Sequence, residues 1–310
     1  MIKVCFAGLG SIGKRHLKNL EYVSQELNLD VKVDALRHTE NNLPIEIKKY
    51  INREIYDPNK LDYYDIVFIT NPTYLHYKTM RLFLNTSKNM FIEKPIFDDI
   101  DYKIDRNMLN KNGVYYVAAP LRYKKVISYL KKNLQKTKIY SVRAICSSYL
   151  PDWRPNTDYK KSYSAKKEEG GGVSIDLIHE WDYLIYLFGF PQEVYNLQGK
   201  FSHLDINSED LSVYIGQYKD KLIELHLDYF GRVPKREIEI YTERATIIGD
   251  LIKNKVSFSD DRNDIEFFDD SNQMYLEEMR NFFDMILNKR ENKNDLFHAY
   301  KVLKFIKGLN

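Results

Sequence analysis

The hydrophobic pattern of the first 120 residues alternates between short apolar runs and stretches with helical periodicity. Residues 2–7 are apolar and rich in β-branched and aromatic side chains, as in a strand covered on both faces. Apolar residues then recur at about 3.6-residue spacing from Ile12 to Val23, which predicts a helix. Further strands are predicted at 31–37, 64–70, 89–96 and 114–120. This alternation favours a doubly wound parallel sheet.

The pattern changes after residue 121. Strand-like segments with in-out alternation follow one another at 139–148, 210–218, 221–230 and 235–243, and a short Lys219–Asp220 turn joins the middle two. Amphipathic helices are predicted near 272–288 and 294–307. We therefore expect an α/β domain over residues 1–121, followed over 122–310 by an α+β domain with a large, mainly antiparallel open sheet.

One helix of the second domain, predicted over 170–189, carries a candidate site. Its apolar stripe is core, but Asp176, His179, Tyr183 and Tyr186 form a second stripe at helical spacing. A carboxylate one turn before a histidine orients the imidazole or stabilises its charged form, which prepares a general acid or base. A solvated surface pair is the alternative.

Composition and charge exclude several classes of protein. The 310 residues include 47 Lys and Arg against 44 Asp and Glu, and this net charge of +3 argues against a nucleic-acid or anionic-membrane partner. Cys5 and Cys146 lack the spacing of metal ligands or of a disulfide framework, so we expect buried thiols and no metal site. Without a secretory cleavage site or a membrane-spanning run, a cytoplasmic protein is expected.

A glycine motif follows the first strand directly. Gly8-Leu9-Gly10-Ser11-Ile12-Gly13 matches the G-x-G-x-x-G fingerprint between a strand and a helix. In that context Gly8 makes the tight turn, Gly10 lets the backbone approach a pyrophosphate, and Gly13 allows close helix packing. The motif predicts a Rossmann-type dinucleotide site, and an ordinary tight turn is the alternative.

The end of the second strand bears on the choice of dinucleotide. Asp34 lies at about the 20-residue distance expected of an acidic ribose reader, but it is in mid-strand. Arg37 and His38 occupy the strand end instead, where a cation would accept a 2′-phosphate. We therefore favour NADP over NAD, with Arg37 as a solvated surface charge the alternative.

Candidate ligand-binding residues recur at the carboxyl ends of the predicted strands. Gly10, Arg37, Asn71, Lys94 and Pro120 all fall at or just beyond such ends. Because ligands of doubly wound sheets gather along that edge, the sequence predicts one site there.

Together these segments resemble the Gfo/Idh/MocA family of sugar and cyclitol oxidoreductases. The resemblance rests on the glycine motif, on Asn71-Pro72-Thr73 with His76, on Glu93-Lys94-Pro95, on Arg122, and on Gly170-Gly171-Gly172 leading to Asp176 and His179. It implies hydride transfer between NAD(P) and a secondary alcohol or ketone, with Lys94, Asp176 and His179 as the catalytic group. Cofactor contacts implied with it are Gly8, Gly10, Ser11, Ile12, Gly13, Arg37, His38, Thr70, Asn71, Pro72, His76, Glu93, Lys94 and Arg122. Many family members place the histidine four residues after the aspartate, whereas His179 comes three residues after Asp176 here.

The segment before the catalytic helix resembles a subgroup associated with bacterial surface-glycan biosynthesis. Trp153, Arg154, Tyr159 and Tyr163 would bind a sugar or sugar nucleotide there, or would pack under a long loop. The family resemblance also implies a homodimer or homotetramer. Two other functions remain open: an enzyme that uses a tightly held NAD(P) transiently for elimination or glycoside cleavage, and a non-catalytic nucleotide-sensing protein.

Overall fold

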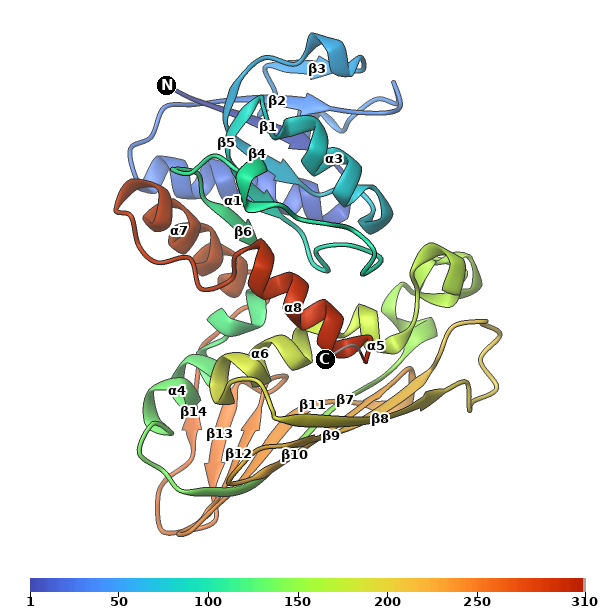
Figure 1. Cartoon of the computed structure of the whole chain (residues 1–310), viewed down its shortest axis with the longest axis vertical. Coiled ribbons are helices and arrows are strands. Elements are labelled where there is room, and N and C mark those ends of the chain that lie inside the picture. Colours follow the sequence, from blue (N-terminus) through green and yellow to red (C-terminus); the bar gives the residue numbers. More distant parts are fainter. Residues whose placement is uncertain (309–310) are drawn as a thin grey trace. The chain divides into compact units, whose positions relative to one another are not determined.

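The computed structural model describes residues 1–308, which form two compact units (Figure 1). The first domain comprises Met1–Ala118 together with Tyr275–Leu303, and the second comprises Ala119–Met274 with the residues from Lys304 onward. The first crossing between the units therefore lies close to the predicted boundary at residue 121.

The first domain is built on a six-stranded sheet in the order β3-β2-β1-β4-β5-β6, with every pair parallel. Its strands are β1 (Ile2–Ala7), β2 (Val31–Leu36), β3 (Arg53–Ile55), β4 (Tyr64–Ile69), β5 (Ser87–Ile92) and β6 (Tyr115–Val117). The helices are α1 (Ser11–Glu26), α2 (Ile45–Lys48), α3 (His76–Phe83) and α7 (Gln273–Leu287). The predicted doubly wound parallel sheet is confirmed.

Helix α7 returns to the first domain from the far end of the sequence. The prediction placed all of 122–310 in the second domain, but Phe282 of α7 is fully buried in the core of the first. Its ring packs edge-on against Phe68 and Phe91, with centroids 6.0 and 5.3 Å away. Arg280 of the same helix pairs with Glu26 of α1 at 2.8 Å. The amphipathic pattern predicts that one face of this helix is buried, but it does not indicate which of the two sheets the helix covers.

The second domain contains an eight-stranded sheet in the order β14-β13-β12-β11-β7-β10-β9-β8. Of its pairs only β7 and β10 are parallel, so the expected mainly antiparallel sheet is confirmed. The strands are β7 (Ile139–Tyr149), β8 (Glu193–Gly199), β9 (Leu211–Gln217), β10 (Leu222–Asp228), β11 (Phe230–Thr242), β12 (Thr246–Asp250), β13 (Lys255–Phe258) and β14 (Ile265–Glu266). The helices are α4 (Lys125–Asn133), α5 (Val173–Asp176) and α6 (Ile178–Phe188), which lie on one face of the sheet (Figure 1), and α8 (Leu296–Ile306), which ends in this domain.

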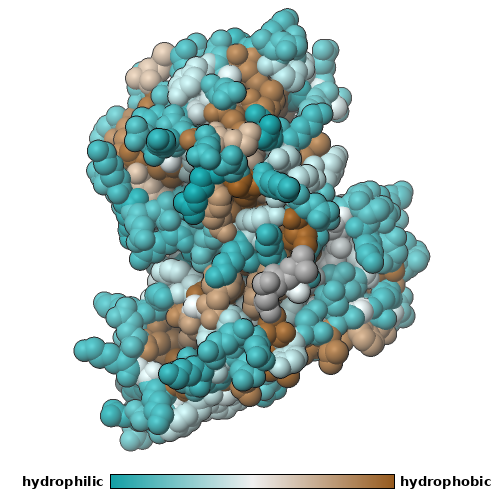
Figure 2. Space-filling view, viewed as in Figure 1, coloured by the Kyte–Doolittle hydropathy of each residue, from teal (hydrophilic) through white to brown (hydrophobic). Residues whose placement is uncertain are grey.

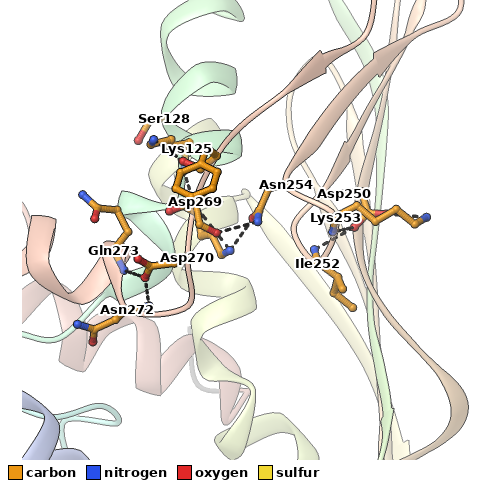
Figure 3. Close-up of polar contacts among 12 residues, drawn as sticks. Lys125, Ser128, Asp250, Ile252, Lys253, Asn254, Asp269, Asp270, Asn272 and Gln273 are labelled. Atoms are coloured by element: carbon orange, nitrogen blue, oxygen red, sulfur yellow. Dashed lines mark hydrogen bonds and ion pairs between the residues drawn. The ribbon is translucent and has the colours of Figure 1, made fainter.

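The start of α4 is fixed by polar residues from the turn before β13 and from the segment after β14 (Figure 3). The buried carboxylate of Asp269 accepts the backbone N–H of Lys125 at 3.3 Å, which supplies a partner for the first turn of the helix. Asn254 accepts a hydrogen bond from Lys124 at 2.7 Å and donates one to the Asp269 carbonyl at 2.9 Å. These polar contacts position the start of the helix, while its buried Val126 and Leu130 side chains pack against β12 at Gly249.

Hydrophilic side chains cover most of the face visible in Figure 2. Within residues 1–308, none of the helices combines the length and the hydropathy that a membrane crossing requires.

We expect Phe282→Ala to lower the free energy of unfolding of the first domain by about 3–5 kcal/mol, because it removes a fully buried ring and leaves a cavity. Urea unfolding followed by circular dichroism measures the change. Leu287→Ala on the same helix is the control, since that side chain is 47% exposed. Equal losses in the two variants would contradict the burial of α7 in this core.

Candidate active site

Close backbone packing forms a turn at the carboxyl end of β1. Gly8 adopts a φ of +103°, and a Cβ there would lie 2.7 Å from the Asn71 Cα atom. A Cβ on Gly13 would lie 2.4 Å from the Gly8 carbonyl oxygen, and the Thr70 hydroxyl donates to that oxygen at 2.6 Å. Only glycine fits at either position. Thr70 therefore contributes by fixing the turn, with its own side chain buried.

The turn is tightly packed, but the N-terminal end of α1 faces open space. Gly10 is the N-cap with an ordinary φ of −68°, and a Cβ there would meet nothing within 4 Å. The helix has no side-chain cap and no acidic residue in its first turn, and Ser11 is exposed. Unpaired N–H groups at the positive end of a 16-residue helix favour an anion. The predicted dinucleotide cradle thus fits the diphosphate of NAD(P).

Beyond β2, the residues weighed for ribose recognition have distinct environments. Asp34 is buried and accepts hydrogen bonds from Arg53 at 2.8 Å and from the Tyr64 hydroxyl at 2.9 Å, so it is structural. Arg37 is bonded to the Glu54 carboxylate and to the Tyr56 hydroxyl, whereas His38 is exposed.

The loop after β4 is held from inside by His76. Its ring is buried, with Nε2 2.9 Å from the Asn71 carbonyl and Nδ1 3.0 Å from the Pro95 carbonyl. Burial lowers the pKa of His76, although the carbonyl oxygens oppose this. His76 therefore connects the loops after β4 and β5, which makes it a positioning residue, while Pro72 beside it is exposed.

Lys94 follows β5 at the same sheet edge, and a buried pair lies directly behind it. Glu93 Oε1 is 2.5 Å from His16 Nε2, and Glu93 Oε2 accepts the Lys94 backbone N–H at 3.1 Å. Burial alone would raise the pKa of Glu93, but His16 and then Lys94 hold it below the usual value. The family resemblance implied a cofactor contact for Glu93, and no role was predicted for His16. In the structure both fix the segment that carries Lys94.

The predicted helix over 170–189 is divided into two. It begins at Val173 and breaks at Leu177, whose φ of −97° and ψ of 23° separate α5 from α6. The prediction of one continuous helix is therefore wrong, and Asp176 ends one segment while His179 lies in the first turn of the next. Tyr183, expected on the polar stripe, is fully buried instead.

The glycines before α5 are packed closely against other residues of the same domain. A Cβ on Gly172, whose φ is +135°, would lie 2.2 Å from a Glu209 carboxylate oxygen. That carboxylate accepts the Ser174 hydroxyl at 2.6 Å. A Cβ on Gly171 would lie 2.1 Å from the Tyr163 carbonyl oxygen. The run therefore lets Glu209 and the preceding loop close on the start of the helix.

Asp176 is buried among aromatic residues. The Tyr229 hydroxyl donates to Asp176 Oδ2 at 2.5 Å. Burial raises the pKa of Tyr229, and the charge of the Asp176 carboxylate raises it further. Tyr163 is 42% exposed. Desolvation raises the pKa of its hydroxyl, and the Asp176 carboxylate raises it further. Trp153 meets Tyr229 edge-on at 5.3 Å between centroids. The structure thus places Tyr163 beside Asp176 and Trp153 beside its partner Tyr229, and their substrate contacts stay predictions.

Two other members of the proposed sugar-binding set lie in different surroundings. The Tyr159 hydroxyl accepts the backbone N–H of Asp205 at 3.2 Å, and Arg154 is exposed. Their substrate contacts stay predictions.

His179 is contacted by a residue that the sequence did not single out. Arg236 of β11 donates to His179 Nε2 at 2.8 Å, and its Nε lies 2.9 Å from Oε1 of the buried Glu180. Because a guanidinium can only donate, the imidazole is neutral with its proton on Nδ1. Burial raises the pKa of Glu180, which Arg236 opposes. Arg236 is 57 residues from His179, so sequence spacing carried no signal for this pair.

Arg122, assigned to the cofactor by resemblance, makes a bidentate pair within the second domain. Its Nε and Nη2 each lie 2.7 Å from a carboxylate oxygen of Asp182 on α6, and both side chains are nearly buried. The pair fixes α6 relative to the chain that enters the domain. Its cofactor contact stays a prediction. Among residues 1–308, no three His, Cys, Asp or Glu side chains are grouped to hold a metal ion.

Residues 2–114 match the model described as "Oxidoreductase family, NAD-binding Rossmann fold", and residues 131–309 match "Oxidoreductase family, C-terminal alpha/beta domain". The chain belongs to the Gfo/Idh/MocA oxidoreductase family. The description of the first model as an NAD-binding Rossmann fold is consistent with the open start of α1.

Two curated relatives are uncharacterised oxidoreductases. YrbE of Bacillus subtilis (strain 168) is 23% identical over 189 residues, which are 59% of this chain and 52% of that protein. The oxidoreductase sll0816 of Synechocystis sp. is 26% identical over 131 residues, or 41% of this chain and 35% of that protein. The chain thus spans about half the length of these relatives or less.

Solved structures resemble the family member over 99% of its length. They include UDP-N-acetylglucosamine 3-dehydrogenase GnnA of Acidithiobacillus ferrooxidans, with a TM-score of 0.76, 17% identity and 96% of that chain covered. A levoglucosan dehydrogenase in complex with NADH has a TM-score of 0.81, 16% identity and 95% coverage. Myo-inositol 2-dehydrogenase of Lactobacillus plantarum has a TM-score of 0.74 and 19% identity, with 95% of that chain covered. At these identities the likeness shows the fold.

We expect Gly10→Ala to leave stability unchanged and to weaken NADH binding by about tenfold or more, because the added methyl group meets no protein atom yet occupies the open start of α1. Gly8→Ala, by contrast, lowers the melting temperature, since its φ is positive and its Cβ overlaps Asn71. Thermal melts and NADH fluorescence titration separate the two effects. Unchanged NADH affinity in a folded Gly10→Ala variant would contradict the cradle.

Proposed function

We propose that this chain is an NAD(P)-dependent dehydrogenase or reductase that interconverts a secondary hydroxyl and a ketone on a sugar, sugar nucleotide or cyclitol. One observation carries the proposal: the open start of α1 and Lys94 stand at the carboxyl ends of β1 and β5, two parallel strands of one sheet with only β4 between them. A dinucleotide site beside a lysine suits hydride transfer at a polarised carbon–oxygen bond.

The roles of the side chains follow from their chemistry. When bound, nicotinamide supplies the acceptor or donor for hydride. Lys94 donates a hydrogen bond to the substrate oxygen and stabilises negative charge that develops there. His179 takes the hydroxyl proton at Nε2 during oxidation, once this nitrogen exchanges its hydrogen bond from Arg236 for one from the substrate, and returns the proton during reduction. Asp176, fixed by Tyr229, holds His179 in position.

The substrate class rests on two supports. Trp153 and Tyr163 place partly exposed aromatic surface beside the hydrogen-bonded pair of Tyr229 and Asp176, which suits the apolar face of a sugar ring. The structural neighbours act on levoglucosan, myo-inositol and a UDP-sugar according to their names. A sugar nucleotide of surface-glycan biosynthesis belongs to this class. For the cofactor, Arg37 supports NADP, whereas the neighbouring Glu54 carboxylate opposes a 2′-phosphate.

Turnover in variants tests the proposal. We expect Lys94→Ala and His179→Ala each to lower kcat about 100-fold or more, the range of general acid–base contributions, while the protein still binds NADH. Absorbance at the reduced-nicotinamide band, with UDP-N-acetylglucosamine, levoglucosan and myo-inositol as the first substrates, measures the rate. Lys78→Ala and His203→Ala, at exposed positions, are matched controls.

Intact turnover in the Lys94 and His179 variants would refute the assigned roles. Product formation without net change in nicotinamide absorbance would favour transient use of a tightly held cofactor. NADH binding without turnover of any sugar would favour a nucleotide-sensing protein.

We further propose that the helix-free face of the second sheet pairs two copies of the chain, in a homodimer or homotetramer. Strand registers place Tyr195, Ile215, Glu224 and Arg143 in one row, and Gly216 faces Trp181 on the opposite, helix-covered side. Tyr195 and Ile215 are exposed there. Light scattering should give at least twice the chain mass of 36.9 kDa, and a monomer would contradict the proposal.

A further inference from the structure

The cation that favours NADP is already paired within the protein. Arg37 at the carboxyl end of β2 is only 10% exposed, and its Nη1 donates to Glu54 Oε2 of the neighbouring strand β3. The same nitrogen donates to the Tyr56 hydroxyl at 3.1 Å, while Nη2 donates to the Asn41 carbonyl at 2.5 Å. The side chain that was expected to hold a 2′-phosphate is therefore held by three acceptors of its own domain.

Glu54 stays charged in this arrangement. Burial alone would raise the pKa of Glu54, but the Tyr56 hydroxyl, which donates to Oε2 at 2.8 Å, and Arg37 lower it below the usual value. Its other oxygen, Oε1, faces Lys48 Nζ at 3.9 Å. The carboxylate is 19% exposed, so it meets solvent and whatever binds at this edge.

Beside Arg37 and Glu54, a 2′-phosphate and a free ribose diol would differ in charge and in the hydrogen bonds they make. The phosphate would bring nearly two negative charges toward a guanidinium whose charge is offset by a carboxylate in direct contact. It would also have to displace acceptors that Arg37 already has. The diol is neutral and can donate hydrogen bonds, which a carboxylate accepts. In doubly wound dinucleotide folds the ribose lies at the end of β2, where this cluster stands.

We propose that Glu54 is the specificity-determining residue at this edge and makes the chain bind NADH in preference to NADPH. This inference rests on the proposed function, because it needs a dinucleotide at the cradle before α1. It reverses the preference inferred from Arg37 alone. The discriminating carboxylate stands on β3, 17 residues after Arg37, rather than at the end of β2 where an acidic ribose reader is sought.

Binding of NADH and NADPH, followed by nicotinamide fluorescence and by calorimetry, tests the inference without any sugar substrate. We expect the wild type to bind NADH at least about tenfold more tightly than NADPH, a ratio equal to ~1.4 kcal/mol. Glu54→Gln keeps the shape and removes the charge, so the NADPH affinity should rise about tenfold relative to that of NADH. In Arg37→Ala/Glu54→Gln this gain should disappear, because the released guanidinium produces it.

Glu193→Gln, an exposed carboxylate on β8 of the other sheet, controls for the change in net charge and should leave the ratio unchanged. Two results would overturn the inference: a wild type that binds NADPH as tightly as NADH, or a folded Glu54→Gln variant with the wild-type ratio. The wild-type ratio decides even if a variant fails to fold. Binding of neither dinucleotide to the wild type would instead refute the proposed function itself, and the inference with it.

Discussion

The close approach of three backbone segments at Gly8 is the constraint on which the first domain depends. The turn after β1, the loop after β4 and the first turn of α1 meet there at distances that leave no room for a Cβ on Gly8 or Gly13. Because they pack so tightly, α1 begins directly over the carboxyl edge of the sheet, and its N–H groups face open space at Gly10. The ligand edge is thus a result of backbone packing, with side chains added around it.

Each residue in the proposed catalytic group is adjacent to a buried polar partner from elsewhere in the sequence. Glu93, beside Lys94, is bonded to His16 of α1, while Asp176 accepts from Tyr229 and His179 accepts from Arg236. Such buried polar groups are expensive to leave unpaired, so each partner restricts the orientations that the site can adopt. The proposed chemistry therefore relies also on residues that contact the catalytic group rather than belong to it.

Local patterns in the sequence predicted the sheets, the glycine turn and the residues along the strand ends, because these depend on periodicity and short spacing. Partners that meet through tertiary packing were not predictable. Glu54 beside Arg37 and Arg236 beside His179 come from other strands, and nothing in their own neighbourhood marks them. The break at Leu177 was missed because an apolar stripe of correct period continues through it. Conversely, Asp34 was rightly set aside, since a mid-strand carboxylate is buried and needs internal donors.

The return of α7 has a consequence for how the chain acquires its structure during synthesis. A polypeptide that emerges from the ribosome in order has completed all six strands of the first sheet by Val117, yet the core around Phe68 and Phe91 still lacks Phe282. Leu17 and Leu20 of α1 already belong to this core, but the part that α7 covers stays exposed while the entire second sheet is made. The dinucleotide-binding half is therefore the first to begin folding and among the last to finish, and a fragment cut at the first crossing between the domains would keep an apolar face exposed to water.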